Sequence, residues 1–312
     1  MSAPGPAQLH TAALTDVGRV RSSNQDAWGE FEDADGLRLL VVADGMGGHR
    51  GGEAASRIAV ETIGSVFRRT GDGAEQRLRQ AFEEANQEVH RRAQEEPSLA
   101  GMGTTGVALL LDGGAGAFVA HVGDSRAYRL RAGRLERLTA DHSLVAELQR
   151  RGLLSEEEAA THPRRNEILR SLGIASDVEV DVAALDVEAG DRFLLCSDGL
   201  CGVVPEPEIA QVLAGSEPPE AARRLVELAN AHGGPDNVTV AIAWLEGAAA
   251  AAVPTAAPRP RARARGRRGI RRVLVLAIVV AGLLAALLLL GLAVGLARGE
   301  EARPAATSPE RG

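Results

Sequence analysis

The sequence predicts a layered α+β domain, followed by one apolar helix near the C-terminus. Three observations lead to this prediction. The apolar run at 39–43 ends at Asp44 and a glycine turn, as a short buried strand does. Further strand-like runs, separated by turn residues, follow in the middle of the chain as in an antiparallel meander. Helical periodicity is grouped between these runs, which favours an α+β arrangement over a parallel βαβ fold.

The periodicity of apolar residues predicts the other elements in order. Residues 10–15 predict a first strand, and 21–26 form a polar run. Apolar residues recur at helical spacing over 54–67 and again over 78–89. A polar, Arg-rich insertion at 143–172 interrupts the later strands. Those strands are expected at 104–111, 117–122, 127–130, 135–138, 178–185, 192–196 and 238–245, and the later helices at 144–152, 156–160, 208–213 and 220–232.

The composition allows one large domain and excludes several classes of protein. With 312 residues, 45% of them hydrophobic, the chain can bury a full core. Beyond Glu246 there are 11 Arg and three Glu, which leaves 24 Arg against 39 acidic residues, a net charge of −15. Such an acidic domain argues against nucleic acid as a partner. Without any lysine, the chain cannot form a P-loop. Cys196 and Cys201 lack C-x-x-C spacing, so we expect reduced thiols.

The C-terminal part predicts a membrane anchor. Residues 273–297 are 25 uncharged residues, roughly 37 Å of helix, which is enough to cross a bilayer. Eight Arg lie directly before this span, at 259–272, and by the positive-inside rule they place the large domain in the cytoplasm. We therefore expect a single-pass protein of the cell membrane that contacts lipid through this helix. Its parts are a domain at 8–246, an Ala-, Pro- and Arg-rich linker at 247–272, the span at 273–297 and a short extracytoplasmic tail at 298–312.

Carboxylates follow strand ends or glycine turns at four places, and Asp26 lies before them. Mg²⁺ and Mn²⁺ prefer oxygen ligands, and a clustered set of carboxylates can hold two such ions about 3.5–4 Å apart. Two ions in this arrangement activate a water for attack at phosphorus. The four strand-terminal carboxylates are Asp44, Asp124, Asp198 and Asp236.

Seven short segments together resemble the metal-dependent type 2C serine/threonine protein phosphatases, in the order of that family over roughly residues 8 to 246. Each segment is weak evidence alone, and the seven in order are specific. The resemblance implies a central sandwich of two antiparallel β-sheets flanked by α-helices, with Mn²⁺ or Mg²⁺ in a cleft at one edge. The segments are 21–26, 42–48, 103–105, 122–126, 138–143, 195–200 and 234–239.

The resemblance also implies roles for individual residues. Asp44 would bridge two ions, and the Gly45 carbonyl would bind one of them. Asp198 and Asp236 would hold the other ion, and Asp26 would act through metal-bound water. Asp124 and Asp198 match a third, weaker site of bacterial members. Arg21 would bind the phosphoryl oxygens, because a guanidinium offers bidentate geometry and charge.

Two residues depart from the family pattern. Gln25 occupies a position where many members have an acid, and Met46 one where some eukaryotic members have a His proposed as general acid, so the general acid is unassigned. We expect hydrolysis of phosphoserine and phosphothreonine in proteins by a two-metal-activated water. The partners would be phosphorylated proteins, among them bacterial Ser/Thr kinases and their substrates. A catalytically inactive metal-binding signalling module and a phosphatase of small phosphorylated molecules are the alternatives.

Overall fold

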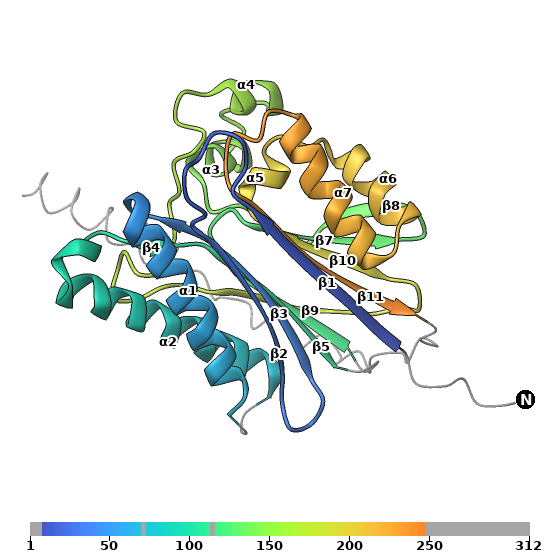
Figure 1. Ribbon diagram of the computed structural model, residues 1–312, viewed down its shortest axis with the longest axis horizontal. Coiled ribbons are helices and arrows are strands. Elements are labelled where there is room, and N and C mark those ends of the chain that lie inside the picture. The colour runs from blue at the N-terminus through green and yellow to red at the C-terminus, as the bar shows by residue number, and fades with distance from the viewer. Residues whose placement is uncertain (1–7, 70–72, 113–115, 247–312) are drawn as a thin grey trace, which may run out of the picture. The chain divides into compact units, whose positions relative to one another are not determined.

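The computed structural model describes residues 8–69, 73–112 and 116–246, which form two antiparallel sheets with helices outside (Figure 1). The first sheet has the strand order β1-β11-β10-β7-β8. The second has the order β2-β3-β5-β6-β9, and the short β4 pairs with β3. Strands of the first sheet are β1 (Gln8–Asp16), β7 (Arg126–Arg131), β8 (Arg134–Arg137), β10 (Arg192–Cys196) and β11 (Val238–Glu246). Strands of the second are β2 (Asp26–Glu32), β3 (Arg38–Met46), β4 (Gly103–Thr104), β5 (Gly106–Asp112), β6 (Gly116–Val122) and β9 (Asp181–Leu185).

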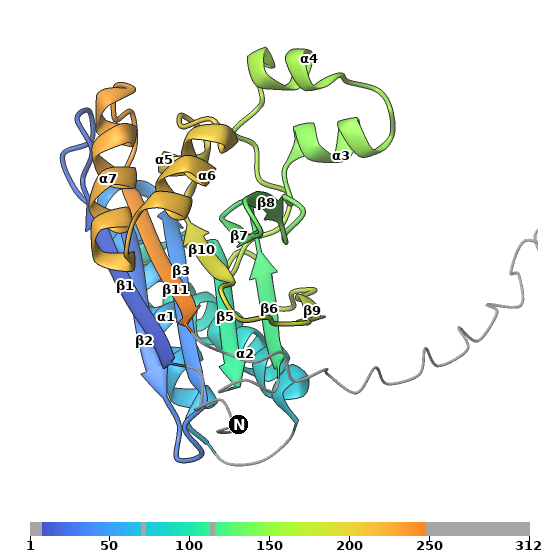
Figure 2. The same ribbon diagram turned by 90° about the vertical axis from the view of Figure 1, so that its right-hand side faces the viewer.

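Two pairs of helices cover the outer faces of the sheets (Figures 1 and 2). The pair on the second sheet is α1 (Gly48–Phe67) and α2 (Ala74–Glu95), and the pair on the first is α6 (Glu206–Gly215) and α7 (Pro218–Ala231). Four shorter helices connect the strands: η1 (Pro97–Leu99), α3 (Leu144–Arg150), α4 (Glu156–Thr161) and α5 (Asp198–Cys201).

The sequence of strand β3 is apolar from Leu39 to Ala43 because both faces of the strand are buried. Successive side chains of a strand point to opposite faces, so a strand buried on both faces needs an apolar residue at every position. Leu39, Val41 and Ala43 belong to the core under α1 and α2. Leu40 and Val42 belong to the core between the two sheets. Rigid packing on both faces holds the end of β3, and therefore Asp44, in place.

Most predicted elements are present within one to three residues of their expected ends. The run at 104–111 is divided into β4 and β5, because Thr105 pairs with the backbone of Asp44 at the break. Strand β2 and helix α5 are absent from the prediction. The insertion contains α3 and α4, and its base is closed by a bridge between Ser143 and Ile168.

The predicted linker at 247–272, span at 273–297 and tail at 298–312 lie outside the described residues. Among the residues that the structure does describe, no helix combines the length and the apolar character that crossing a membrane requires.

Candidate metal centre

The strand pairing brings the predicted carboxylates together. In the register of β2 with β3, Asp26 lies directly opposite Asp44. Asp198 follows β10 as the first residue of α5, and Asp236 precedes β11, the neighbour of β10 in the first sheet. The carboxyl groups of Asp44 and Asp198 are close enough to share a proton, so the two sheets meet at this cluster. Asp124, just beyond β6, is near enough to raise the pKa of Asp44 through its charge.

The glycine turn after β3 depends on close backbone contacts. A Cβ on Gly45 would lie 2.0 Å from the carbonyl oxygen of Gly52 in α1, a distance that no side chain tolerates. Gly47 has a φ of 116°, and a Cβ there would lie 2.7 Å from the Cα of Met102. Because only glycine permits these approaches, the turn brings the start of α1 against the Asp44 backbone.

Hydroxyl groups form hydrogen bonds to the backbone of Asp44 and to the carboxylate of Asp26. The Thr105 Oγ1 accepts a hydrogen bond from the Asp44 amide at 3.0 Å, and the Thr104 hydroxyl donates to the Asp44 carbonyl at 2.7 Å. The Ser197 hydroxyl donates to Asp26 Oδ2 at 2.7 Å. Ser197 in turn accepts from the Thr239 amide at 3.0 Å, which ties Asp26 across to the first sheet. Sequence reasoning did not identify Ser197 or Thr239, although both lie inside the segments that carry the resemblance.

Mutual repulsion and burial shift the pKa values of these acids upward. Burial raises the pKa of Asp26 to about 7, against the lowering effect of its Ser197 hydrogen bond. Burial raises the pKa of Asp124 to about 7 as well, with a further contribution from the Asp198 charge. The pKa values of Asp44 and Asp198 are also raised, first by burial and then by neighbouring carboxylates. Acids that repel one another in this way favour a bound cation.

Two orphaned oxygens fit a metal site directly. The Oδ1 atoms of Asp26 and Asp198 are buried and have no hydrogen-bond partner among the described residues. A buried carboxylate oxygen without a partner costs free energy, which a divalent ion would recover because it takes oxygen ligands. The carboxylates of this cluster therefore fit the divalent metal ions that the sequence predicts.

Arg21 lies at the exposed edge of this cluster. Its Nη2 is 2.7 Å from Asp236 Oδ2, and 53% of its side chain is exposed. The loop behind it is held by Asn237, whose Nδ2 donates to the carbonyls of Val17 and Ser23 at 2.9 Å each. The guanidinium thus stands beside the carboxylates with one face open to a ligand, which is the arrangement that binding a phosphoryl group requires.

The two departures from the family pattern have separate structural settings. Gln25 Nε2 donates to the Gly48 carbonyl at 2.8 Å, so this amide fastens the glycine turn instead of adding a charge to the cluster. Met46 pairs with Gly103 at the end of β3 and is half-buried.

A second group of possible ligand atoms lies elsewhere. One atom each of His121, His142 and Asp181 lie within 4.8 Å of one another. His142 Nδ1 accepts a hydrogen bond from the Gly123 amide at 3.1 Å. Its Nε2 lies 3.1 Å from Arg170 Nη1, which can only donate, and 3.4 Å from Asp181 Oδ2. The positive charge of Arg170 beside this nitrogen opposes a bound cation. Burial lowers the pKa of His142 to about 4, so the ring is a neutral structural group.

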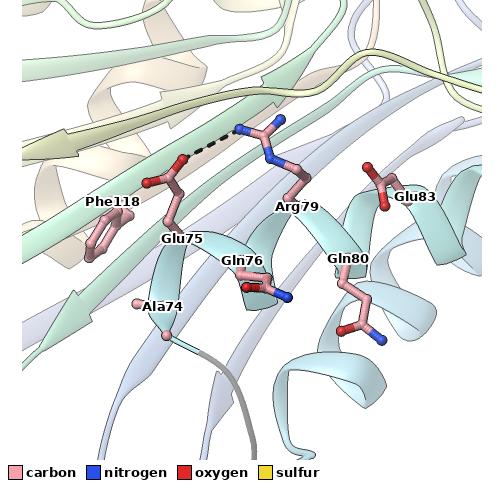
Figure 3. Close-up of a pocket in the computed structure, with 8 residues that line it drawn as sticks. Ala74, Glu75, Gln76, Arg79, Gln80, Glu83 and Phe118 are labelled. Carbon is pink, nitrogen blue, oxygen red and sulfur yellow. Dashed lines mark ion pairs between the residues drawn. The ribbon is translucent and has the colours of Figure 1, made fainter.

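A groove of about 790 Å³ is lined by the first turns of α2 and by Phe118 of β6 (Figure 3). Its lining includes Glu75, Arg79 and Phe118, and an ion pair of 3.5 Å joins Glu75 to Arg79. None of the residues that line it belongs to the predicted metal centre.

Comparison with known proteins gives one consistent family. A family model described as protein phosphatase 2C matches residues 18–230. The serine/threonine phosphatase stp of Listeria monocytogenes is 42% identical over 238 residues, which cover 74% of this chain and 94% of that protein. The serine/threonine protein phosphatase PstP of Mycobacterium tuberculosis is 41% identical over 236 residues, covering 75% of this chain and 45% of that protein.

Solved structures show the same relationship. The S. agalactiae serine/threonine phosphatase matches with a TM-score of 0.72 at 40% identity, covering 77% of this chain and 100% of the other. The catalytic domain of a phosphatase PstP, solved in complex with two manganese ions, matches with a TM-score of 0.67 at 38% identity, covering 76% of this chain and 98% of the other.

Proposed function

Because this chain belongs to the protein phosphatase 2C family and is a metal-dependent serine/threonine protein phosphatase, we propose that the carboxylate cluster at the end of the sandwich is its active centre. The observation that carries this proposal is the pair of buried, unpartnered Oδ1 atoms of Asp26 and Asp198. Asp26 lies on β2 of the second sheet and Asp198 follows β10 of the first, and both are beside Asp44, so one cluster would collect ligands from the ends of both sheets. The hydrogen bond from Ser197 to Asp26 would orient one of these ligands.

Different residues of the cluster would bind different metal ions. Asp44 is placed between the other carboxylates and would contact two ions, with the Gly45 carbonyl as a further oxygen ligand. Asp198 and Asp236 would hold the second ion, and Asp26 would contact ordered water at the first. Divalent ions bound there activate a water for attack at phosphorus and offset the charge of the phosphoryl group.

A third, weaker ion would use Asp124 together with Asp198. Both acids have raised pKa values, and the charge of Asp198 contributes to the shift of Asp124, which shows that the two groups are close. Either Mn²⁺ or Mg²⁺ suits a site made of oxygen ligands.

Arg21 would bind the phosphoryl oxygens. In the structure it pairs with Asp236 at 2.7 Å, and an ion on Asp236 would free the guanidinium for the substrate. Guanidinium groups hold phosphate through two parallel hydrogen bonds, so Arg21 would fix the phosphorus relative to the carboxylate cluster. An inactive metal-binding module would need neither this open arginine nor its position.

The substrates would be phosphorylated proteins, and the chain would oppose Ser/Thr kinases at the cytoplasmic face of a cell membrane. The support for a membrane location is in the sequence: eight Arg at 259–272 stand before 25 uncharged residues at 273–297. An apolar span of this length would tether the phosphatase domain near membrane-bound substrates.

The experiment that tests the proposed function compares substrates and metals. We expect the purified protein to hydrolyse phosphoserine and phosphothreonine peptides and p-nitrophenyl phosphate in Mn²⁺, and to be inactive after chelation. Calorimetric titration of the chelated protein with Mn²⁺ should show at least two sites, and Asp198→Asn should remove one of them. Activity that persists without any divalent ion would contradict the proposal.

A further inference from the structure

The loop between β1 and β2 exposes an apolar side chain beside Arg21. Val20 is 70% exposed, the largest fraction among the exposed large hydrophobic residues that the structure describes. An exposed valine is common on protein surfaces and needs no explanation by itself. Its neighbours in the chain make this one unusual, because Arg21 follows it directly and binds at the active centre.

The backbone on either side of Val20 is held against the loop that contains Gly234, Asp236 and Asn237. Gly18 has a φ of 82°, and a Cβ there would lie 2.2 Å from the carbonyl oxygen of Asp236. The Arg19 amide donates to the Gly234 carbonyl at 2.8 Å. With the Asn237 bonds on either side, this part of the chain has little freedom to fold Val20 against the protein. The loop therefore presents the side chain outward from a rigid support.

Arg19 provides a cation at the same place. Its stem lies against Gly234, and no residue among those described accepts a hydrogen bond or an ion pair from its guanidinium. By contrast, Arg150 and Arg151 each contact Glu147. Arg19 is thus available to a carboxylate from outside the chain.

We propose that Arg19 and Val20 form a specificity element that contacts the peptide on either side of the phosphorylated residue. This inference rests on the proposed function of Arg21. Consecutive Cα atoms are about 3.8 Å apart, so a phosphoserine or phosphothreonine held at Arg21 has its neighbouring side chains within reach of Val20. An aliphatic residue next to the phosphorylated one gains apolar contact with Val20. A carboxylate nearby pairs with Arg19. Figure 1 shows the β1–β2 connection at the same end of the sheets as α5, where Asp198 lies.

The test compares three substrates on the whole protein in Mn²⁺. They are a phosphothreonine peptide with aliphatic and acidic flanking residues, a matched peptide flanked by Ser and Gly, and p-nitrophenyl phosphate. The variants are Val20→Ser, Arg19→Gln, which keeps the stem on Gly234, and Arg19→Glu. Leu153→Ser and Arg134→Glu are the matched controls, because both side chains are exposed and neither residue belongs to the predicted metal centre or to the β1–β2 loop.

We expect Val20→Ser to lower kcat/KM for the peptide with aliphatic and acidic flanking residues about fivefold relative to the Ser/Gly peptide, mainly through KM. Arg19→Glu should lower kcat/KM for the same peptide about tenfold, and Arg19→Gln should lower it less. Both Arg19 effects should be weaker at high salt. Equal losses on all three substrates, or the same losses in the two control variants, would overturn the specificity element. Failure of the unaltered protein to hydrolyse any phosphopeptide while it hydrolyses p-nitrophenyl phosphate would overturn the proposed function, and the inference with it.

Discussion

Replacing Asp26 with asparagine should stabilise the protein without metal and destabilise it with metal. In the metal-free protein the pKa of Asp26 is raised from 3.8 to about 7, which corresponds to about 4 kcal/mol of unfavourable free energy for the charged form. The folded state therefore keeps a proton that the unfolded state loses between about pH 4 and pH 7. Stability that is present below pH 4 is lost as the pH rises through this window, and asparagine removes that loss.

The substitution also has a cost, which decides the net effect. Asparagine can keep the hydrogen bond from Ser197 through its Oδ1, but its Nδ2 then replaces the buried oxygen that has no partner. An unpaired buried donor costs about 1–3 kcal/mol. Near pH 8 the variant should therefore be more stable than the metal-free native protein by about 2 kcal/mol. Near pH 4, where the electrostatic gain is small, the variant should be less stable by about 1 kcal/mol.

Urea unfolding of the chelated protein at pH 4 and pH 8 measures this change of sign. Asp35→Asn, at an exposed acid in the β2–β3 hairpin, is the matched control and should change stability by less than about 0.5 kcal/mol. In saturating Mn²⁺ the native protein gains about 4 kcal/mol at 1,000 times the dissociation constant, and the variant gains less. A variant that is less stable than the native protein at pH 8 without metal would refute the argument that burial of the charged Asp26 carboxylate is the larger effect.

Three further predictions concern Arg21, Thr105 and the anchor. Arg21→Ala should raise KM for p-nitrophenyl phosphate about tenfold or more and leave a measurable rate, because we propose that the guanidinium binds the phosphoryl group; unchanged KM and kcat would make Arg21 a surface charge. Thr105→Val should lower kcat with the fold retained, because the Asp44 amide loses its acceptor at 3.0 Å, whereas an unchanged kcat would show that this bond does not position Asp44. Protein ending at Gly247 should be soluble and active on p-nitrophenyl phosphate, while the full chain should stay with membranes after a high-salt wash. Release of the full chain by salt alone would show that the arginines, and not the apolar span, make the attachment.

The sequence was sufficient to predict strand β3, which ends at the carboxylate cluster. Strand β3 is buried on both faces, so its apolar run and the carboxylate that ends it are visible without any tertiary information. Strand β2 was missed because it lies at the edge of its sheet and mixes acids with aromatic residues, so no alternation marks it. Its pairing with β3, which sets Asp26 opposite Asp44, depends on contacts that sequence patterns do not show.

The hydrogen bonds that support the site could not be predicted from the sequence either. Ser197 and Asp26 are 171 residues apart in the chain, and Gln25 and Asn237 are 212 apart. Serine and asparagine are common at turns for local reasons, so their types alone do not reveal such distant partners. The raised pKa values have the same origin, because burial and the approach of carboxylates distant in the sequence both arise only in the folded protein.

Asp44→Asn tests the central claim most directly, because Asp44 is the proposed ligand of both ions. An amide keeps the shape of the side chain but cannot supply the negative charge that two cations would share. We predict a folded protein, with an unchanged circular dichroism spectrum, that hydrolyses neither phosphopeptides nor p-nitrophenyl phosphate and binds fewer Mn²⁺ ions by calorimetry. Near-normal turnover by folded Asp44→Asn protein would contradict a two-metal centre at this cluster.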